Sequence, residues 1–214
     1  MLIAGHKNRS NMMSLIRLMI PSVVIFSASL FLSSPAQAEL EWKLDENRSV
    51  LNFVSVKNDH VAELHRFNEL KGELLGEELT IQIPVKSLDT QIAIRDERMR
   101  EHLFNAKEHP FITAKATIPH SSITDIPVLT TVPLEVDFKV FIAGEAQRVN
   151  SVVQITRLDV ERFLATTAQP VLISTKDFKL VEGVNRLREI ANLEAIDYVV
   201  PVTFSVQFER QPPQ

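Results

Sequence analysis

Residues 84–111, PVKSLDTQIAIRDERMREHLFNAKEHPF, leave one segment of alternating apolar and polar residues, cross a run dense in charge, and enter another alternating segment. Ile92, Met99 and Leu103 are spaced by seven and four residues, which places them on one face of a helix. Pro110 ends any helix that reaches it. The stretch therefore predicts one short amphipathic helix that caps an end of a sheet, with its charges in solvent.

Most of the remaining chain alternates with period two, as antiparallel strands with one polar face do. The clearest segments are Leu79–Val85, Leu134–Val140 and Val200–Phe208. Further strands are expected at 49–56, 61–67, 69–75, 111–118, 149–158 and 170–176, and Glu182 and Gly183 are expected at a turn. Such a set of strands closes into a barrel or stacks as a two-sheet sandwich. A barrel of about eight strands is either filled by its side chains or holds one small ligand.

The first 38 residues have the pattern of a signal peptide. A basic leader without acidic residues precedes the charge-free run Leu18–Leu32, and Ala36-Gln-Ala38 supplies a small-x-small cleavage site. The run is shorter than the roughly 20 apolar residues of a membrane span. We expect cleavage after Ala38, which leaves an exported domain at residues 39–214.

The exported domain carries 20 Lys and Arg against 27 Asp and Glu once the leader is removed, a formal charge of −7. This sign argues against nucleic acid as a partner, because phosphate neutralisation dominates such binding. The chain contains no cysteine, which excludes disulfides and a lipid-modified amino-terminal cysteine. Its stability must come from apolar packing and sheet hydrogen bonds.

No reaction centre is apparent in the sequence. It has no Gly-x-Ser-x-Gly elbow and no glycine-rich phosphate loop. His60 and His65 are interpreted as isolated surface or loop residues, because no histidines have metal-ligand spacing. Asp89 and Asp96 form the one carboxylate pair worth considering, but Arg95 beside Asp96 favours an ion pair. We expect no catalytic residues, no metal and no cofactor.

Four motifs resemble the YceI-like family: Ser87-Leu-Asp-Thr90, Arg95-Asp-Glu-Arg-Met-Arg100, Leu103-Phe-Asn-Ala106 and His109-Pro-Phe-Ile112. Trp42-Lys-Leu-Asp45 followed by Ser49-Val-Leu-Asn-Phe53 is similar to the opening strand of that family. The resemblance covers residues 40–209. The chain departs from the pattern at Glu63-Leu-His-Arg66, where the family usually has Gly before the Phe of the second strand, and at Arg98, where it usually has His.

The resemblance implies an all-β, lipocalin-like antiparallel barrel of about eight strands, with one short helical connection near 90–105 and an elongated apolar interior. Members are exported bacterial proteins, which implies the periplasm, and some hold a polyisoprenoid chain, often with a quinone-like head. That function is binding rather than catalysis.

The residues expected to line such an interior are the inward positions of the alternating strands: Phe53, Leu79, Ile81, Ile83, Phe111, Leu134, Val136, Phe138, Val140, Phe204 and Val206. Alternation by itself fits a solid core equally well.

Ser87, Asp89, Arg95 and Asp96 are the candidate mouth residues. Ser87 and Asp89 are also plausible caps for the helix. We expect Arg95 to pair with one of the carboxylates and to fix the helical connection against the strand ends.

Three functional hypotheses follow. The leading one is a non-enzymatic periplasmic carrier for a polyisoprenoid, a quinone-like or another lipid-like amphiphile. The second is an envelope stress or accessory protein with a filled core that acts through a protein partner. The third gives Asp89, Asp96 and Arg95 an acid–base role on a hydrophobic substrate. The sequence leaves open a homodimer and a membrane protein that delivers the ligand.

Overall fold

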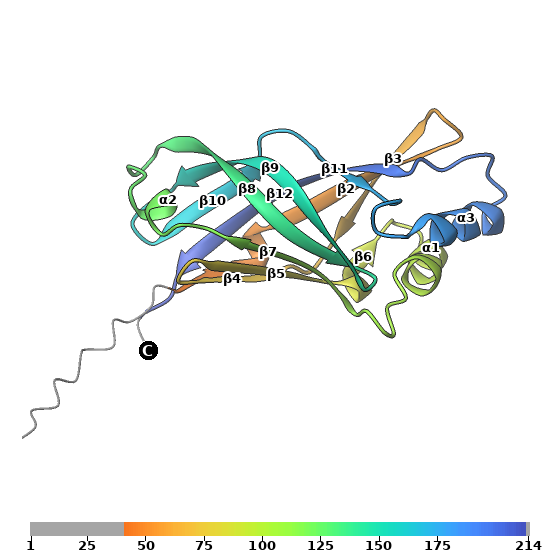
Figure 1. The fold of residues 1–214 in the computed structure, drawn as a ribbon, viewed down its shortest axis with the longest axis horizontal. Helices are drawn as coiled ribbons and strands as arrows, with labels where there is room; N and C mark the ends of the chain where they lie inside the picture. The colour runs from red at the N-terminus through yellow and green to blue at the C-terminus, as the bar shows by residue number, and fades with distance from the viewer. Residues whose placement is uncertain (1–40, 213–214) are drawn as a thin grey trace, which may run out of the picture. The chain divides into compact units, whose positions relative to one another are not determined.

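Residues 41–212, which the structure describes, contain twelve strands that form one antiparallel sheet closed on itself in the computed structural model (Figure 1). The strands are β1 Glu41–Leu44, β2 Val50–Lys57, β3 Val61–Phe67, β4 Lys71–Leu75, β5 Glu78–Pro84, β6 Leu88–Asp89, β7 Phe111–Thr117, β8 Thr131–Ile142, β9 Glu145–Arg157, β10 Arg162–Thr167, β11 Val171–Ser174 and β12 Val199–Arg210. Strand β12 closes the sheet, because it pairs with β1 and β2 along one side and with β10 and β11 along the other.

The barrel has eight strand positions, since four of them are divided in two: β1 and β2, β3 and β4, β5 and β6, and β10 and β11. For example, β4 pairs with β1 while β3 pairs with β2. Each position neighbours the next one along the chain, and the last closes on the first, so that of the described strands only short ones such as β6 and β11 are paired on one side alone. The predicted lipocalin-like barrel is confirmed, and the two-sheet sandwich is not the fold.

Short helical turns divide two of these positions. A 3₁₀ turn, η1 at Glu46–Arg48, separates β1 from β2, and the Asp45 carboxylate at its start accepts from Asn47 N at 2.9 Å. A second turn, η2 at Val85–Ser87, separates β5 from β6, and Ser87 Oγ donates to Pro84 O at 2.7 Å. Ser87 therefore stabilises a bend between strand segments instead of capping the helix that follows.

Apolar side chains alternate into the barrel along the two longest hairpin strands. Strand β8 pairs with β9 so that Leu134 lies opposite Val153 and Val136 lies opposite Ser151. Leu134, Val136 and Val153 all face the interior, and the charged residues between them on β8 are exposed. The alternation predicted for β5, β8 and β12 is confirmed in each strand.

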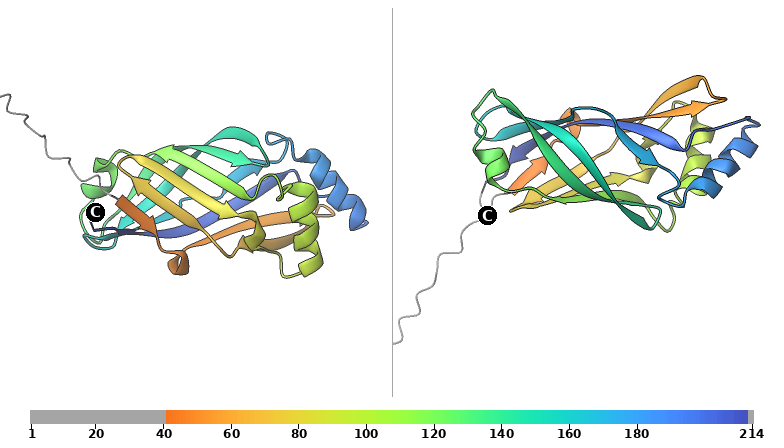
Figure 2. Two further views of the ribbon diagram at one scale, coloured as in Figure 1. Left: turned by 90° about the horizontal axis from the view of Figure 1, so that it is seen from below. Right: turned by 45° about the horizontal axis from the view of Figure 1, so that its top comes forward.

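The longer helices gather at one end of the barrel, and one short helix lies at the other end (Figure 2). Helix α1, Ala93–Arg98, continues into the π-helix η3, Met99–Leu103, and helix α3, Val181–Ile190, packs against η3. The short helix α2, Ser121–Thr124, lies at the opposite end (Figure 1). None of the helices in residues 41–212 has the length and apolar character needed to cross a bilayer.

Helix α3 was not predicted, because Glu182 and Gly183 were assigned to a turn. Gly183 lies inside the helix for a packing reason: a Cβ there would come within 2.6 Å of His102 O and 3.0 Å of Leu103 Cα. The absence of a side chain thus allows α3 to approach the backbone of η3 closely. The predicted helix near 90–105 is present but begins at Ala93, after Ile92 as its cap.

The end of the barrel next to α2 is filled by aromatic packing. Trp42 is 1% exposed, and its ring lies 5.0 Å from Phe163, which stacks on Phe208 at 4.9 Å. The Arg157 guanidinium lies 4.9 Å from the centre of the Trp42 ring and donates to the carbonyls of Asp159 and Val160, each at 2.5 Å. Its N–H donors therefore have hydrogen-bond acceptors although the residue is buried. We call this the closed end.

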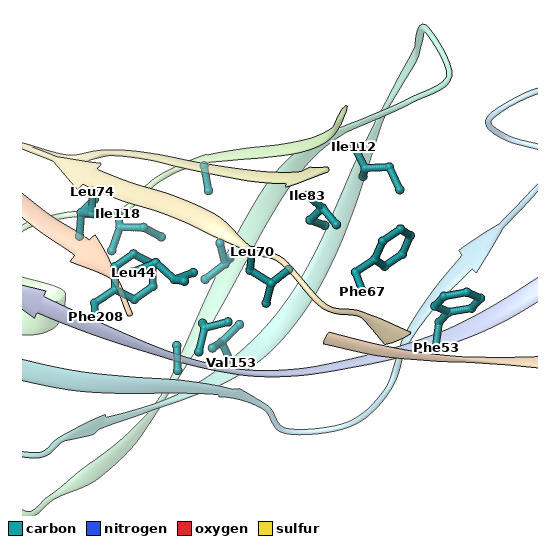
Figure 3. Packing of buried hydrophobic residues seen from close by; sticks show 14 of the residues in the cluster. Leu44, Phe53, Phe67, Leu70, Leu74, Ile83, Ile112, Ile118, Val153 and Phe208 are labelled. Atoms are coloured by element: carbon teal, nitrogen blue, oxygen red, sulfur yellow. The ribbon is translucent and has the colours of Figure 1, made fainter. Parts of the chain in front are cut away.

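Figure 3 shows how the packing changes along the barrel. Leu44, Leu74, Ile118 and Phe208 gather near the closed end, while Phe53, Phe67 and Ile112 lie toward the other end. The residues at the closed end anchor β1, β4, β7 and β12 to one another.

Replacement of Phe208 by Ala should lower the free energy of unfolding by about 3–5 kcal/mol, because it leaves a cavity beneath Trp42 and Phe163. Val199→Ala on the same strand is the matched control; its side chain is exposed, so the change should stay within about 0.5 kcal/mol. Urea unfolding measures both. Equal midpoints for the two variants would contradict the packing described for the closed end.

Candidate ligand-binding cavity

The barrel encloses a cavity of about 550 Å³. Small-molecule sites commonly measure about 300–1,000 Å³, so this space is large enough for a ligand. Its wall is almost entirely aliphatic and aromatic along the barrel, and polar side chains join it only toward the helical end. The expectation of a filled core, on which the second functional hypothesis rested, is wrong.

Ten of the eleven predicted lining residues lie on the cavity wall: Phe53, Leu79, Ile81, Ile83, Leu134, Val136, Phe138, Val140, Phe204 and Val206. Their contact with a ligand stays a prediction. Phe111 is the exception, because its side chain is 43% exposed and lies outside the cavity. Strand β7 has the opposite phase from the one predicted: Ile112 and Ala114 face inward.

Sequence reasoning missed a further part of the wall. Val149, Val153 and Ile155 of β9 line the cavity, and so do Ile173 of β11 and Leu187 of α3. The period-two pattern of β9 contains this signal, but polar residues such as Ser151 interrupt it. Leu187 could not be found from strand periodicity because it lies on the unpredicted helix.

The cavity reaches the surface at the helical end. Ile92 and Ile94 both line the cavity, yet they are 47% and 51% exposed. Leu187 and Ile190 of α3 contribute to the wall in the same region. We call this opening, which is lined from the sides of α1 and α3, the mouth. Figure 2 shows α1 and α3 at the end of the barrel opposite α2 and the closed end.

Arg95 organises the mouth through a carboxylate that was not predicted. Its Nη1 donates to Glu63 Oε2 at 2.8 Å, and Lys57 Nζ lies 3.0 Å from the same oxygen. Its Nε and Nη2 donate to Thr90 Oγ1 and Thr90 O at 2.8 and 2.6 Å. The expected partner, Asp89 or Asp96, was therefore wrong, but Arg95 does join the helical connection to the strand ends.

The charge of Glu63 is stabilised by its two cations. Burial opposes its ionisation, but the hydrogen bonds and charges of Lys57 and Arg95 outweigh this effect and hold the pKa of Glu63 below its ordinary value. The three side chains form an ion network at one side of the mouth. Lys57, Glu63 and Arg95 all line the cavity.

Asp96 and Asp89 do not line the cavity. Asp96 is buried and accepts from Thr90 N at 2.8 Å and from Thr90 Oγ1 at 2.5 Å, so it fixes the start of α1. Asp89 accepts from Gln91 N at 2.8 Å and from Arg66 at 2.9 Å, and these hydrogen bonds lower its pKa. Both carboxylates have structural partners, which gives no support to acid–base chemistry in the cavity.

His65 is buried, in contrast to the surface or loop position expected from the sequence. Its side chain lines the cavity, the residue is 3% exposed, and Nε2 lies 2.8 Å from Ser55 Oγ. The Nδ1 atom is also buried, and no hydrogen-bond partner for it is present among residues 41–212. Burial lowers the pKa of His65, and the charge of Arg95 adds to this shift, while Glu63 and Asp96 oppose it.

The fold and the cavity together define a class: a lipocalin-like barrel with an apolar interior that opens at one end. Residues 42–208 match the model of the YceI-like domain. The chain therefore belongs to the YceI-like family.

Two solved structures show the same architecture. A polyisoprenoid-binding domain from Saccharophagus degradans, implicated in plant cell wall breakdown, is 30% identical, with a TM-score of 0.78 over 80% of this chain and 99% of that one. BcnA from Burkholderia cenocepacia is 16% identical, with a TM-score of 0.57 over 77% of this chain and 98% of that one, and shows the fold alone. No curated protein sequence matches the chain with significant similarity.

Arg95→Ala should lower the free energy of unfolding by about 1–2 kcal/mol, because it removes hydrogen bonds to Glu63 and Thr90. It should also reduce retention of any bound lipid, since α1 is then less firmly held at the mouth. Glu97→Ala is the control on the same helix; Glu97 is exposed, lies outside the cavity wall and forms no ion pair with another residue of the described chain, so the change should stay within about 0.5 kcal/mol. An Arg95→Ala variant with unchanged melting temperature and lipid retention would contradict this role.

Stability should fall as the pH drops below 6.5, the ordinary pKa of histidine, because unfolded His65 then binds a proton that the folded protein excludes. The contribution of Glu63 to the free energy of unfolding is lost only as the pH falls below 4.5, the ordinary pKa of glutamate. Urea unfolding between about pH 5 and pH 7 thus isolates the histidine effect. His65→Phe should remove this part of the pH dependence, whereas His60→Phe, in the turn between β2 and β3, should retain it. Identical pH profiles for wild type and His65→Phe would contradict the burial of a neutral imidazole.

Proposed function

We propose that this protein is a non-enzymatic binding or carrier protein that holds one long apolar chain, of the polyisoprenoid class, inside its barrel. The observation that carries the proposal is the apolar cavity of about 550 Å³ with a mouth between α1 and α3. The similarity to the polyisoprenoid-binding domain from Saccharophagus degradans supports the same ligand class.

The energetics of such binding need no special polar chemistry. Each CH₂-sized group moved out of water contributes roughly 0.8 kcal/mol, so about twenty groups give a gross term of about 16 kcal/mol. Immobilisation of the protein and chain removes a large part of that term. Micromolar affinity requires about 8 kcal/mol, which the remainder can supply.

The proposed location is the periplasm. The support is the signal peptide pattern of residues 1–38, which lie outside the described residues. The homodimer and the membrane protein that would deliver the ligand stay predictions.

Organic extraction of the purified protein, followed by mass spectrometry, tests the function. We expect one prenyl-chain species at near-equal stoichiometry with the protein. Intact mass of the same sample should show a chain that begins at Glu39. Reproducible recovery of empty protein that also fails to take up an added prenyl lipid would contradict the carrier proposal, and a retained leader would contradict the cleavage.

A matched pair of variants on β7 locates the ligand. Ala114→Phe places a ring into the cavity and should retain less than about a fifth of the wild-type lipid, because close-packed atoms exclude the chain. Thr117→Phe places the same ring on the exposed face of the strand and should retain the wild-type amount. Equal lipid content in both variants would show that the ligand binds elsewhere.

A further inference from the structure

His65 carries a hydrogen-bonding atom that the described residues leave unpaired inside an otherwise apolar wall. Buried polar atoms in proteins nearly always have a partner, and each exception calls for an explanation. Trp42 Nε1 is also buried without a partner, but Trp42 lies at the closed end and does not line the cavity. His65 does line the cavity, so its ring borders the space that a ligand would occupy.

The surroundings of His65 favour an uncharged ligand atom. Lys57 and Arg95, the cations of the ion network beside it, both already bind the single carboxylate of Glu63. An anionic head group would have to compete with that carboxylate for them. The lowered pKa of His65 also favours the neutral imidazole, which attracts no anion.

A neutral imidazole paired with a serine can serve either kind of oxygen. When Ser55 Oγ donates to Nε2, the proton sits on Nδ1, which then donates to a carbonyl. When Nε2 carries the proton and donates to Ser55, Nδ1 accepts from a hydroxyl. Both tautomers of His65 therefore require one uncharged oxygen atom of the ligand, close to Ser55 on β2 and His65 on β3.

We propose that Ser55 and His65 form a head-group subsite, in which an uncharged oxygen at the end of the apolar chain hydrogen-bonds to His65 Nδ1. This inference rests on the proposed function and extends it to the polar end of the ligand. The chain then runs from His65, near the mouth, toward the closed end at Trp42.

The test compares three probes that share one all-trans C20 isoprenoid chain: the alcohol, the hydrocarbon without the hydroxyl, and the phosphate ester. Each probe is tritiated and partitions between phosphatidylcholine vesicles and delipidated protein. Wild type, His65→Leu, His65→Gln and the exposed-turn control His60→Leu are measured in parallel. The quantity of interest is the ratio of alcohol to hydrocarbon affinity, compared between variants so that vesicle partitioning cancels.

His65→Leu should reduce that ratio about tenfold, the size expected for loss of one buried hydrogen bond to a ligand hydroxyl. It should leave hydrocarbon affinity unchanged, which also shows that the variant is folded. His65→Gln should recover part of the ratio, and His60→Leu should match wild type. If His65→Leu does not fold, His65→Phe replaces it, since Phe restores the ring that lies 5.1 Å from Phe53.

The outcomes separate this inference from the proposed function. If wild type and His65→Leu both bind the hydrocarbon and have the same ratio of alcohol to hydrocarbon affinity, the subsite is overturned and the carrier proposal stands. Tighter binding of the phosphate ester than of the alcohol by wild type overturns the uncharged head group. Failure of wild type to bind either the hydrocarbon or the alcohol overturns the carrier and the subsite together.

Discussion

The pairing of β12 on both of its sides is the constraint on which the rest of the structure depends. It joins β1 and β2 to β10 and β11, so the sheet closes on itself and its strands turn one face away from water. Alternation along the strands then becomes a division between a polar outside and a dry inside. A cavity walled by aliphatic side chains and a buried neutral histidine are both consequences of that closure.

The barrel is filled at one end and hollow along the rest because of how its side chains are distributed. Trp42, Phe163 and Phe208 fill the closed end, and the Arg157 guanidinium lies against the Trp42 ring. Along the rest of the barrel, inward side chains as different in size as Ala114 and Phe138 line a space that they do not fill. The strand order is set by the sheet hydrogen bonds, while the inward side chains set the extent of the cavity.

Strand periodicity and the family motifs predicted most of the barrel, since apolar alternation follows directly from burial of one strand face. Strand β10, Arg162–Thr167, was missed because Phe163, Leu164 and Ala165 are consecutive apolar residues that show no period-two alternation. The phase of β7 was wrong because Phe111, its largest apolar residue, lies on the outer face. The Arg95–Glu63 pair joins segments that are far apart in sequence, and the burial of the unpaired His65 nitrogen depends on the folded barrel around it. No local sequence pattern could reveal either feature.

The closed end imposes an order of entry on any chain that occupies the tube. Because Trp42 and Phe208 close that end, a lipid with a polar head would enter with its apolar tail first and leave with its head first. The distance from the closed end to the mouth would limit the length of chain that fits inside. Units beyond that depth must emerge between α1 and α3. The same end of a bound chain would thus always be the one exposed at the mouth, where a protein or membrane that supplies or removes the lipid could contact it.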